Sequence, residues 1–245
     1  MNTAKAEQHT FYRDNIIIKD LISFSVLIKE TDLLILADTL LIEEAKEKVM
    51  QYRYHLDKYI SKNPDFLKSL IPLPSDPYAP SIIKEMFQAA ILAQVGPMAS
   101  VAGAIAEMVG KDLLEHTSQI VVENGGDIFL KISKDLTIGI YAGNSPLSNK
   151  LGLKIPSHLT PLGVCTSSGT VGHSLSFGKS DSVTVIAQST PLADATATAT
   201  GNLVKKKSDI GKGLEYAQNI KGIIGTLIIV DDQFGARGDI EIVTV

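Results

Sequence analysis

One uncharged stretch, residues 86–106 (MFQAAILAQVGPMASVAGAIA), limits the folds open to this chain more than any other feature. Its length would span a bilayer. However, Gly96-Pro97 interrupts it, and much of it is alanine, glycine and serine rather than leucine or phenylalanine. A helix that is apolar on every side must be buried. The stretch therefore predicts two short core helices, 81–94 and 97–115, that meet at Gly96-Pro97.

Strand patterns lie on both sides of these helices. Segments rich in Ile, Val and Leu predict strands at 15–27, 33–37, 120–123, 128–132, 136–141, 151–155, 163–166, 182–187, 227–230 and 240–245. Residues 39–60 and 211–220 predict further helices, and 63–80 carries five prolines, which is typical of a surface connection. This order predicts one α+β domain with antiparallel or mixed sheets. Its parts are strands and helix at 1–62, the connection at 63–80 and a site-bearing core at 81–245.

Composition narrows the classes of function. The chain has 245 residues, 44% of them hydrophobic and 20% charged, as in ordinary soluble proteins. A net charge of −4, with a single short basic run at 205–207, argues against a nucleic-acid partner. The only cysteine, Cys165, rules out an internal disulfide framework, and the first residues lack the apolar core of a secretory signal. We therefore expect a cytoplasmic protein with no membrane partner. The apolar 96–109 segment would suit burial inside the chain or at a homo-oligomer interface.

Residues 163–202 concentrate hydroxyl side chains, glycines and one histidine. Thr190 suits an N-cap, Pro191 suits the first helical position and Gly201 suits a left-handed stop, so a helix is predicted between them. Asp194 and Thr198 are four residues apart and would project from one helix face. Such oxygen groups can hold a hard cation. The alternative is an aspartate favoured by the helix dipole beside a threonine bonded to its own turn.

Two other segments carry candidate chemistry. Thr166-Ser167-Ser168-Gly169-Thr170 offers hydroxyls and bare backbone N–H groups that suit a phosphate, or else forms an ordinary Ser/Thr turn. Residues 124–127 (NGGD) predict a hairpin turn.

Nucleophile–base pairs are also conceivable in this region. Cys165 with His173, or Ser167 or Ser168 with His173 and Asp181, would supply such a pair. Nothing in the sequence orients the Cys165–His173 pair, and no nucleophile elbow supports the serine triad.

Four motifs occur here in the order seen in one protein family. Residues 124–128 (NGGDI) resemble the N-x-G-G-D-[IL] turn of the ApbE family, the FAD:protein FMN transferases. Residues 166–169 (TSSG), 183–187 (VTVIA) and 193–199 (ADATATA) resemble its T-S-G, V-t-V-I-A and A-D-a-l-a-T-A segments. Residues 95–103, 122–127 and 165–178 also look like a cytosolic, functionally uncharacterised branch of this superfamily.

The resemblance implies an ApbE-like α+β fold with a site for FAD beside a magnesium ion. It implies phosphoryl transfer, in which FMN passes to a threonine of a protein acceptor and AMP leaves. Asp194 and Thr198 would hold the metal, and Asp194 and His173 are the candidate catalytic residues. The candidate nucleotide contacts are Asn124, Gly125, Gly126, Asp127, Thr166, Ser167, Ser168 and Gly169.

The chain departs from the family pattern at two places. The family's H-[IV]-[IL]-[DN]-P is replaced by residues 173–178 (HSLSFG), which lack the acidic or amide residue and the proline. The family's K-G-Y-x-V-D has no clear equivalent, because residues 95–98 (VGPM) stand there without the lysine. Two hypotheses follow: a magnesium-dependent flavin-nucleotide enzyme, or a ligand-binding or assembly protein that keeps the pocket without transferase activity.

Overall fold

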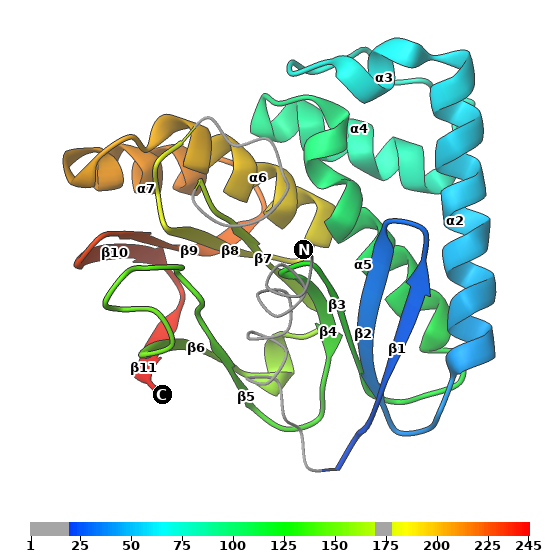
Figure 1. Ribbon diagram of the computed structural model, residues 1–245, viewed down its shortest axis with the longest axis horizontal. Coiled ribbons are helices and arrows are strands. Elements are labelled where there is room, and N and C mark those ends of the chain that lie inside the picture. The colour runs from blue at the N-terminus through cyan, green and yellow to red at the C-terminus, as the bar shows by residue number, and fades with distance from the viewer. Residues whose placement is uncertain (1–19, 170–177) are drawn as a thin grey trace, which may run out of the picture.

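An eight-stranded antiparallel sheet forms the centre of the molecule in a computed structural model that describes residues 20–169 and 178–245 (Figure 1). Every neighbouring pair of strands in it is antiparallel. In sheet order the strands are β1 (Ile22–Ile28), β2 (Thr31–Ala37), β3 (Ile120–Asn124), β4 (Asp127–Lys131), β7 (Leu162–Ser167), β8 (Ser182–Ala187), β9 (Ile223–Val230) and β10 (Gln233–Gly238). A second antiparallel sheet contains β11 (Glu241–Thr244), β6 (Leu151–Ile155) and β5 (Leu136–Gly139).

Helices pack on one face of the large sheet, and the small sheet lies over the other face (Figure 1). The helices within the described residues are α2 (Ile42–Lys62), α3 (Pro64–Lys68), α4 (Ser81–Ala93), α5 (Val101–Leu113), α6 (Thr190–Leu203) and α7 (Ile210–Gln218). The predicted α+β class with antiparallel sheets is therefore confirmed.

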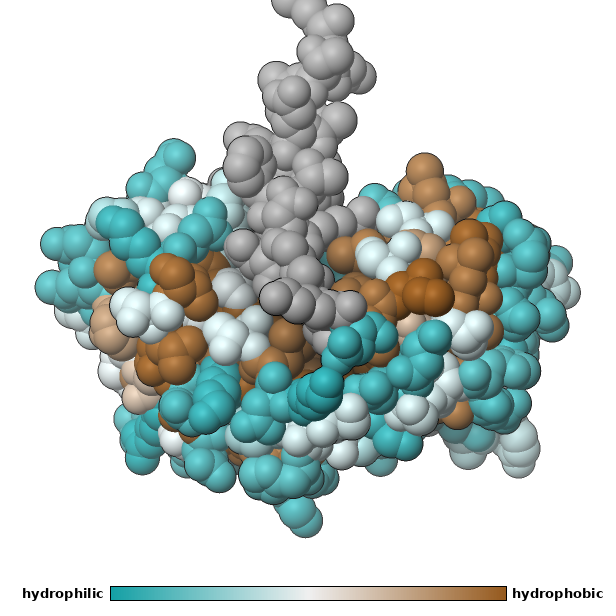
Figure 2. All heavy atoms as spheres, turned by 90° about the horizontal axis from the view of Figure 1, so that it is seen from below, coloured by the Kyte–Doolittle hydropathy of each residue, from teal (hydrophilic) through white to brown (hydrophobic). Residues whose placement is uncertain are grey.

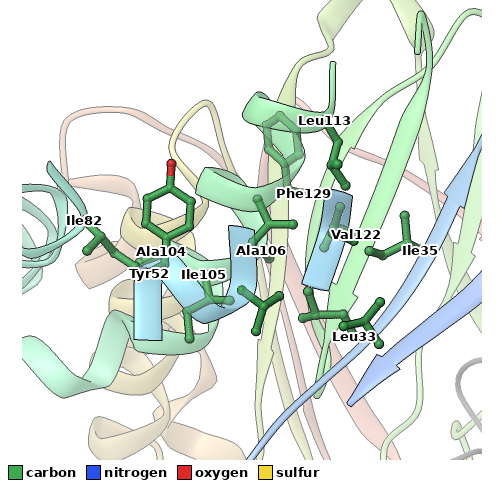
Figure 3. Packing of buried hydrophobic residues seen from close by; sticks show 14 of the residues in the cluster. Leu33, Ile35, Tyr52, Ile82, Ala104, Ile105, Ala106, Leu113, Val122 and Phe129 are labelled. Carbon is green, nitrogen blue, oxygen red and sulfur yellow. The ribbon is translucent and has the colours of Figure 1, made fainter. Parts of the chain in front are cut away.

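The first core lies between α5 and strands β2 to β4. Figure 3 shows Val122 and Phe129 of the sheet beside Ala106 and Leu113 of α5, and all four side chains are almost completely buried. Alternate residues of a strand face opposite sides of a sheet. Val121, the neighbour of Val122, accordingly joins the core between the two sheets. The molecule thus has apolar layers on both faces of its large sheet, and on the surface apolar patches are interspersed with polar side chains (Figure 2).

The break predicted at Gly96-Pro97 is present. A short 3-10 turn, η2 (Pro97–Ser100), follows it and leads into α5, and the segments Ser81–Ala93 and Pro97–Leu113 are bent by 104°. No single helix within the described residues is long and apolar enough to cross a membrane. A side chain at Gly96 would place its Cβ 1.8 Å from the Ser69 carbonyl oxygen, so this bend brings the chain against the proline-rich connection.

The proline-rich connection contains a helix that the sequence did not predict. Asn63 precedes α3, which begins at Pro64, a favoured first helical residue. Phe66 of α3 is 1% exposed, and its ring lies 5.2 Å, centre to centre, from the rings of both Tyr59 and Phe87 in edge-to-face geometry. This aromatic cluster fixes the connection against α2 and α4.

Three local predictions differ from the structure. Residues 233–238, which lie between the strands predicted at 227–230 and 240–245, form the additional strand β10; its residues are largely exposed, and backbone pairing with β9 holds it. Ser189, rather than Thr190, is the N-cap of α6, and it accepts the Leu192 N–H. Gly201 lies inside α6 without a left-handed φ, because the helix continues to Leu203.

Candidate functional site

The β3–β4 hairpin brings Asp127 to the helical side of the sheet. Asn124 and Asp127 pair directly, and Gly125 and Gly126 between them have φ values of 66° and 104°. This left-handed backbone is one that glycine adopts without steric cost, so the predicted turn is confirmed. The Asn124 side chain donates to the Ala102 carbonyl at 3.0 Å and so connects the hairpin to α5. Asp127 follows with only 7% of its surface exposed.

Helix α6 carries Asp194 and Thr198, and a contact with α5 fixes the position of α6. The buried Glu107 of α5 accepts the Thr190 N–H at the start of α6 through Oε2 and binds Lys111 through Oε1. A carboxylate at a helix N-terminus stabilises the exposed N–H groups there. The contact sets where α6 begins, and hence where Asp194 lies one turn further on.

Asp194 in turn accepts a hydrogen bond from the first turn of α5. Its Oδ2 accepts the Gly103 N–H at 2.9 Å. A Cβ on Gly103 would lie 2.9 Å from the Asp194 Cβ and 2.8 Å from the Thr190 carbonyl oxygen. Glycine at this position therefore permits the close approach of α5 and α6 that orients the carboxylate.

Asp127, Asp194 and Thr198 line one cavity of about 740 Å³. This volume falls in the range of about 300–1,000 Å³ that is usual for small-molecule pockets. The remaining wall is mainly apolar and comes from the connection at 67–70, residues 94–102, the end of α6 and Tyr216 of α7. Lys68 is the one basic side chain among the described residues that line the cavity. The cavity thus has an acidic corner, formed by Asp127, Asp194 and Thr198, and a mainly apolar wall.

Burial dominates the electrostatics of that corner. Burial raises the pKa of Asp194 to about 7, while the backbone N–H groups of Gly103 and Ala102 act in the opposite direction. Burial also raises the pKa of Asp127, and the nearby charge of Asp194 raises it further. Within the described residues, Asp127 Oδ1 is buried and has no hydrogen-bond partner. Two neighbouring carboxyl groups therefore face this corner without a basic side chain between them.

Cys165 does not have the features of a nucleophile. Its side chain is completely buried, and Sγ lies 3.4 Å from the Thr190 carbonyl oxygen. Burial raises the pKa of its thiol, as do the charges of Asp127 and Asp194. Reactive cysteines need a stabilised thiolate. His173, its proposed partner, lies outside the described residues.

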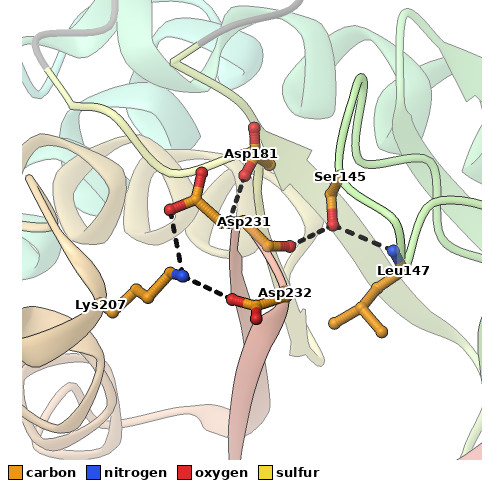
Figure 4. Close-up of polar contacts among 6 residues, drawn as sticks. All are labelled: Ser145, Leu147, Asp181, Lys207, Asp231 and Asp232. Carbon is orange, nitrogen blue, oxygen red and sulfur yellow. Dashed lines mark hydrogen bonds and ion pairs between the residues drawn. The ribbon is translucent and has the colours of Figure 1, made fainter.

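Asp181, the third member of the alternative hydrolase triad, has a structural contact. It accepts the Asp231 N–H at 2.6 Å in the β9–β10 turn, where Ser145 donates to the Asp231 carbonyl (Figure 4). Asp231 has a left-handed φ of 52°, and Lys207 forms ion pairs with both Asp231 and Asp232. These contacts hold the turn together.

The threonine–serine segment is divided between the two faces of the sheet. The Thr166 hydroxyl lies 2.9 Å from that of Thr184. Cys165 belongs to the core under α6, whereas Val164 belongs to the core between the sheets. By strand alternation, Thr166 faces the core between the sheets and Ser167 faces the core under α6.

Only part of the predicted site meets at the cavity. Among the described residues that line it are Asp127, Asp194 and Thr198, and the lining residues do not include Asn124, Gly125, Gly126, Thr166, Ser167, Ser168 or Gly169. Gly169 instead donates its N–H to the Ser180 carbonyl at 2.9 Å.

Sequence reasoning missed the far wall. Tyr216 lines the cavity, and its hydroxyl donates to the Ala93 carbonyl at 2.7 Å. Gln94, which ends α4 with a left-handed φ of 54°, also lines it. A glutamine in this conformation is uncommon. Neither residue belongs to a motif, so we find no sequence signal that would have selected them.

Comparisons with known proteins agree with this fold. A family model described as AbpE bacteria matches residues 15–222. A UPF0280 protein of Methanocaldococcus jannaschii is 45% identical over 221 residues, which cover 88% of this chain and 90% of that protein. A UPF0280 protein of Methanococcus vannielii is 46% identical over 227 residues, which cover 90% and 92%.

Solved structures give the same picture. The apo form of flavinyl transferase ApbE from Pseudomonas stutzeri matches with a TM-score of 0.61 at 17% identity, over 89% of this chain and 94% of that one. An ApbE protein from Thermotoga maritima matches with a TM-score of 0.56 at 13% identity, over 89% and 97%. At these identities the similarity establishes the fold.

Proposed function

Because this chain belongs to the family described as AbpE bacteria, we propose that it is a magnesium-dependent, flavin-nucleotide transferase-like enzyme of the cytoplasm. The observation that carries the proposal is the meeting of Asp194, Thr198 and Asp127 in one cavity of about 740 Å³. The structural similarity to flavinyl transferase ApbE supports the choice of a flavin nucleotide as ligand. FAD is the proposed substrate, and a hydroxyl group of a protein is the proposed acceptor.

The residues of the acidic corner suit magnesium. All its side-chain donors are oxygens, which hard cations prefer. Burial and the charge of Asp194 raise the pKa of Asp127, and a bound cation would offset both effects by stabilising the ionised carboxylates. Asp194 and Thr198 would hold the ion. Bound there, it would neutralise charge on a pyrophosphate and polarise a phosphoryl group.

The chain's own groups would position the ligand. The Gly103 N–H holds the Asp194 carboxylate in place, and Asn124 ties the hairpin that carries Asp127 to α5. Apolar residues of the wall, such as Val95 and Met98, would exclude water from a bound ring system. The segment 166–169 and His173 remain candidate contacts for the nucleotide.

A second function is favoured by one observation. Apart from Lys68, the described lining residues offer no positive charge to a pyrophosphate. A protein that binds a ligand there, or assists assembly, without transferring a group would keep the same pocket.

One experiment separates these proposals. The purified full chain is incubated with FAD, with and without Mg²⁺, and the products are separated to detect FMN and AMP while binding is followed by flavin fluorescence. Because no acceptor protein is present, water takes the place of the acceptor hydroxyl, and we expect magnesium-dependent hydrolysis of FAD to FMN and AMP. Asp194→Asn should abolish this hydrolysis, and the exposed Asp231→Asn should leave it unchanged. Binding without turnover would favour the second function. Absence of both would refute the flavin proposal.

A further inference from the structure

Asp127 occupies an unusual position for a carboxylate. It begins β4, pairs with Cys165 of β7 and is 7% exposed, yet it lines the same cavity as Asp194 and Thr198. Asp194 reaches the cavity from α6, a different element. Two carboxylates from separate elements therefore converge on one wall.

The Oδ1 atom of Asp127 has no hydrogen-bond partner among the described groups, although it is fully buried. Leaving a buried polar atom unpartnered destabilises the folded state, and more so if the group is charged. By contrast, Oδ2 of Asp194 accepts the Gly103 N–H at 2.9 Å. Asp127 thus keeps one buried oxygen without a partner, although its carboxyl group also interacts with the Cys165 thiol and the Thr166 N–H.

The described surroundings do not supply a counter-charge close at hand. Lys68, the basic residue of the lining, comes from α3 in the connecting segment. No group of three or more His, Cys, Asp or Glu side chains placed to hold a metal occurs within the described part of the chain. A cation here would accordingly be held by two carboxylates and a hydroxyl, the hard oxygen donors that Mg²⁺ and Mn²⁺ accept.

We propose that Asp127 supplies, through Oδ1, a third protein ligand to the divalent cation that Asp194 and Thr198 hold. This inference rests on the proposed function, which assigns the cation to the latter two residues. It gives the hairpin a role in metal binding in place of direct contact with the nucleotide. The orphaned oxygen then gains a partner when the cation binds.

The competing explanation is a carboxylic acid that stays protonated and has only a structural role. Asparagine distinguishes the two, because it has the shape of a protonated aspartate but cannot offer a charged oxygen ligand. Under the competing explanation Asp127→Asn leaves cation affinity unchanged. Under our proposal it lowers that affinity while the fold persists.

The test uses the metal-free full chain and Mn²⁺ as the probe, without nucleotide. Binding is titrated by the electron paramagnetic resonance signal of free Mn²⁺, and competition by Mg²⁺ checks that the site is shared. Changes in the second shell of a metal site typically cost about 10–100-fold in affinity, so loss of a direct ligand in Asp127→Asn should cost at least about tenfold. Asp194→Asn should have an effect of similar size. Asp181→Asn, which removes a buried carboxylate elsewhere, should bind Mn²⁺ like the wild type.

The outcomes separate this inference from the proposed function. Wild-type affinity in Asp127→Asn with loss in Asp194→Asn would overturn the third ligand and leave the proposed metal pair intact. Absence of Mn²⁺ binding by the wild type, with or without FAD, would overturn both. If circular dichroism shows that Asp127→Asn does not fold, Asp127→Ser is measured in its place under the same criterion.

Discussion

Replacing Gly103 with alanine tests whether the close contact between α5 and α6 positions Asp194 in the site. The added Cβ would lie 2.8 Å from the Thr190 carbonyl oxygen and 2.9 Å from the Asp194 Cβ. These atoms are backbone and the first side-chain carbon, so no rotation about a side-chain bond can relieve the contact. The two helices must instead move apart.

Two opposing effects set the size of the change. Alanine is favoured over glycine inside a helix by about 1 kcal/mol. Overpacking a well-packed interior typically costs about 1–3 kcal/mol, and a contact with rigid atoms belongs at the upper end of that range. We therefore expect Gly103→Ala to lower the free energy of unfolding by about 2 kcal/mol, or the melting temperature by roughly 4–8 °C in a chain of this size.

Gly211→Ala is the matched control. Gly211 lies in the first turn of α7, and no atom lies within 4 Å of the position that its Cβ would take. The control isolates the helix preference of alanine, so its stability should rise by up to about 1 kcal/mol. Urea unfolding followed by circular dichroism measures both variants under identical conditions, and Mn²⁺ titration reports whether Asp194 has moved.

Two results would contradict these expectations. A Gly103→Ala variant as stable as Gly211→Ala would show that α5 and α6 have room to accept a side chain. A destabilised Gly103→Ala variant with unchanged Mn²⁺ affinity would show that the contact supports the fold without orienting Asp194.

Two further predictions concern stability. Phe129→Ala should lower the free energy of unfolding by about 3–5 kcal/mol, because the ring is 1% exposed in the main core. A Cβ on Gly110 would lie 2.3 Å from the Cδ1 atom of the Phe129 ring. In a double-mutant cycle, Gly110→Ala should therefore be far less destabilising in the Phe129→Ala background than in the wild type. Asp38→Asn should cost about 1 kcal/mol at neutral pH, since this exposed carboxylate accepts hydrogen bonds, chiefly from Ser118 and also from Thr117, that lower its pKa from 3.8 to about 2. Because the pKa of Asp38 is lower in the folded state, its ionised form stabilises the fold at pH values above 3.8, and this contribution is lost as the pH falls through 2. A difference from wild type that keeps its full size well below pH 2 would contradict this account.

Several local features of this fold could be predicted from residues that are close together in the sequence. The NGGD sequence at 124–127 predicted the hairpin, and the two left-handed residues that form the turn are Gly125 and Gly126, one position beyond the Asn-Gly pair. Gly96-Pro97 predicted the break between two buried helices, because proline lacks the N–H that would continue the first helix. The spacing of Asp194 and Thr198 likewise predicted a shared helix face, and both line the cavity.

Some differences could have been foreseen from strand geometry. Thr166 and Ser167 are adjacent in β7, so their side chains point to opposite faces of the sheet, as the alternation of a strand predicts. Others depended on the tertiary structure. Gly201 resembles a helix stop in sequence, yet Gly178 lies so close to it that a Cβ there would be 1.9 Å from the Gly201 carbonyl oxygen. In the structure α6 continues through Gly201 to Leu203.

The fold class, the turn at 124–127 and the shared helix face of Asp194 and Thr198 could be predicted because each leaves a local pattern in the sequence. What surrounds Asp194 and Thr198 depends on tertiary packing. It placed Asp127 beside Asp194 from another element, and it brought the connection at 67–70 and Tyr216 over the cavity. Contacts between residues far apart in the chain leave no periodic pattern, because they arise from the way helices pack on the sheet.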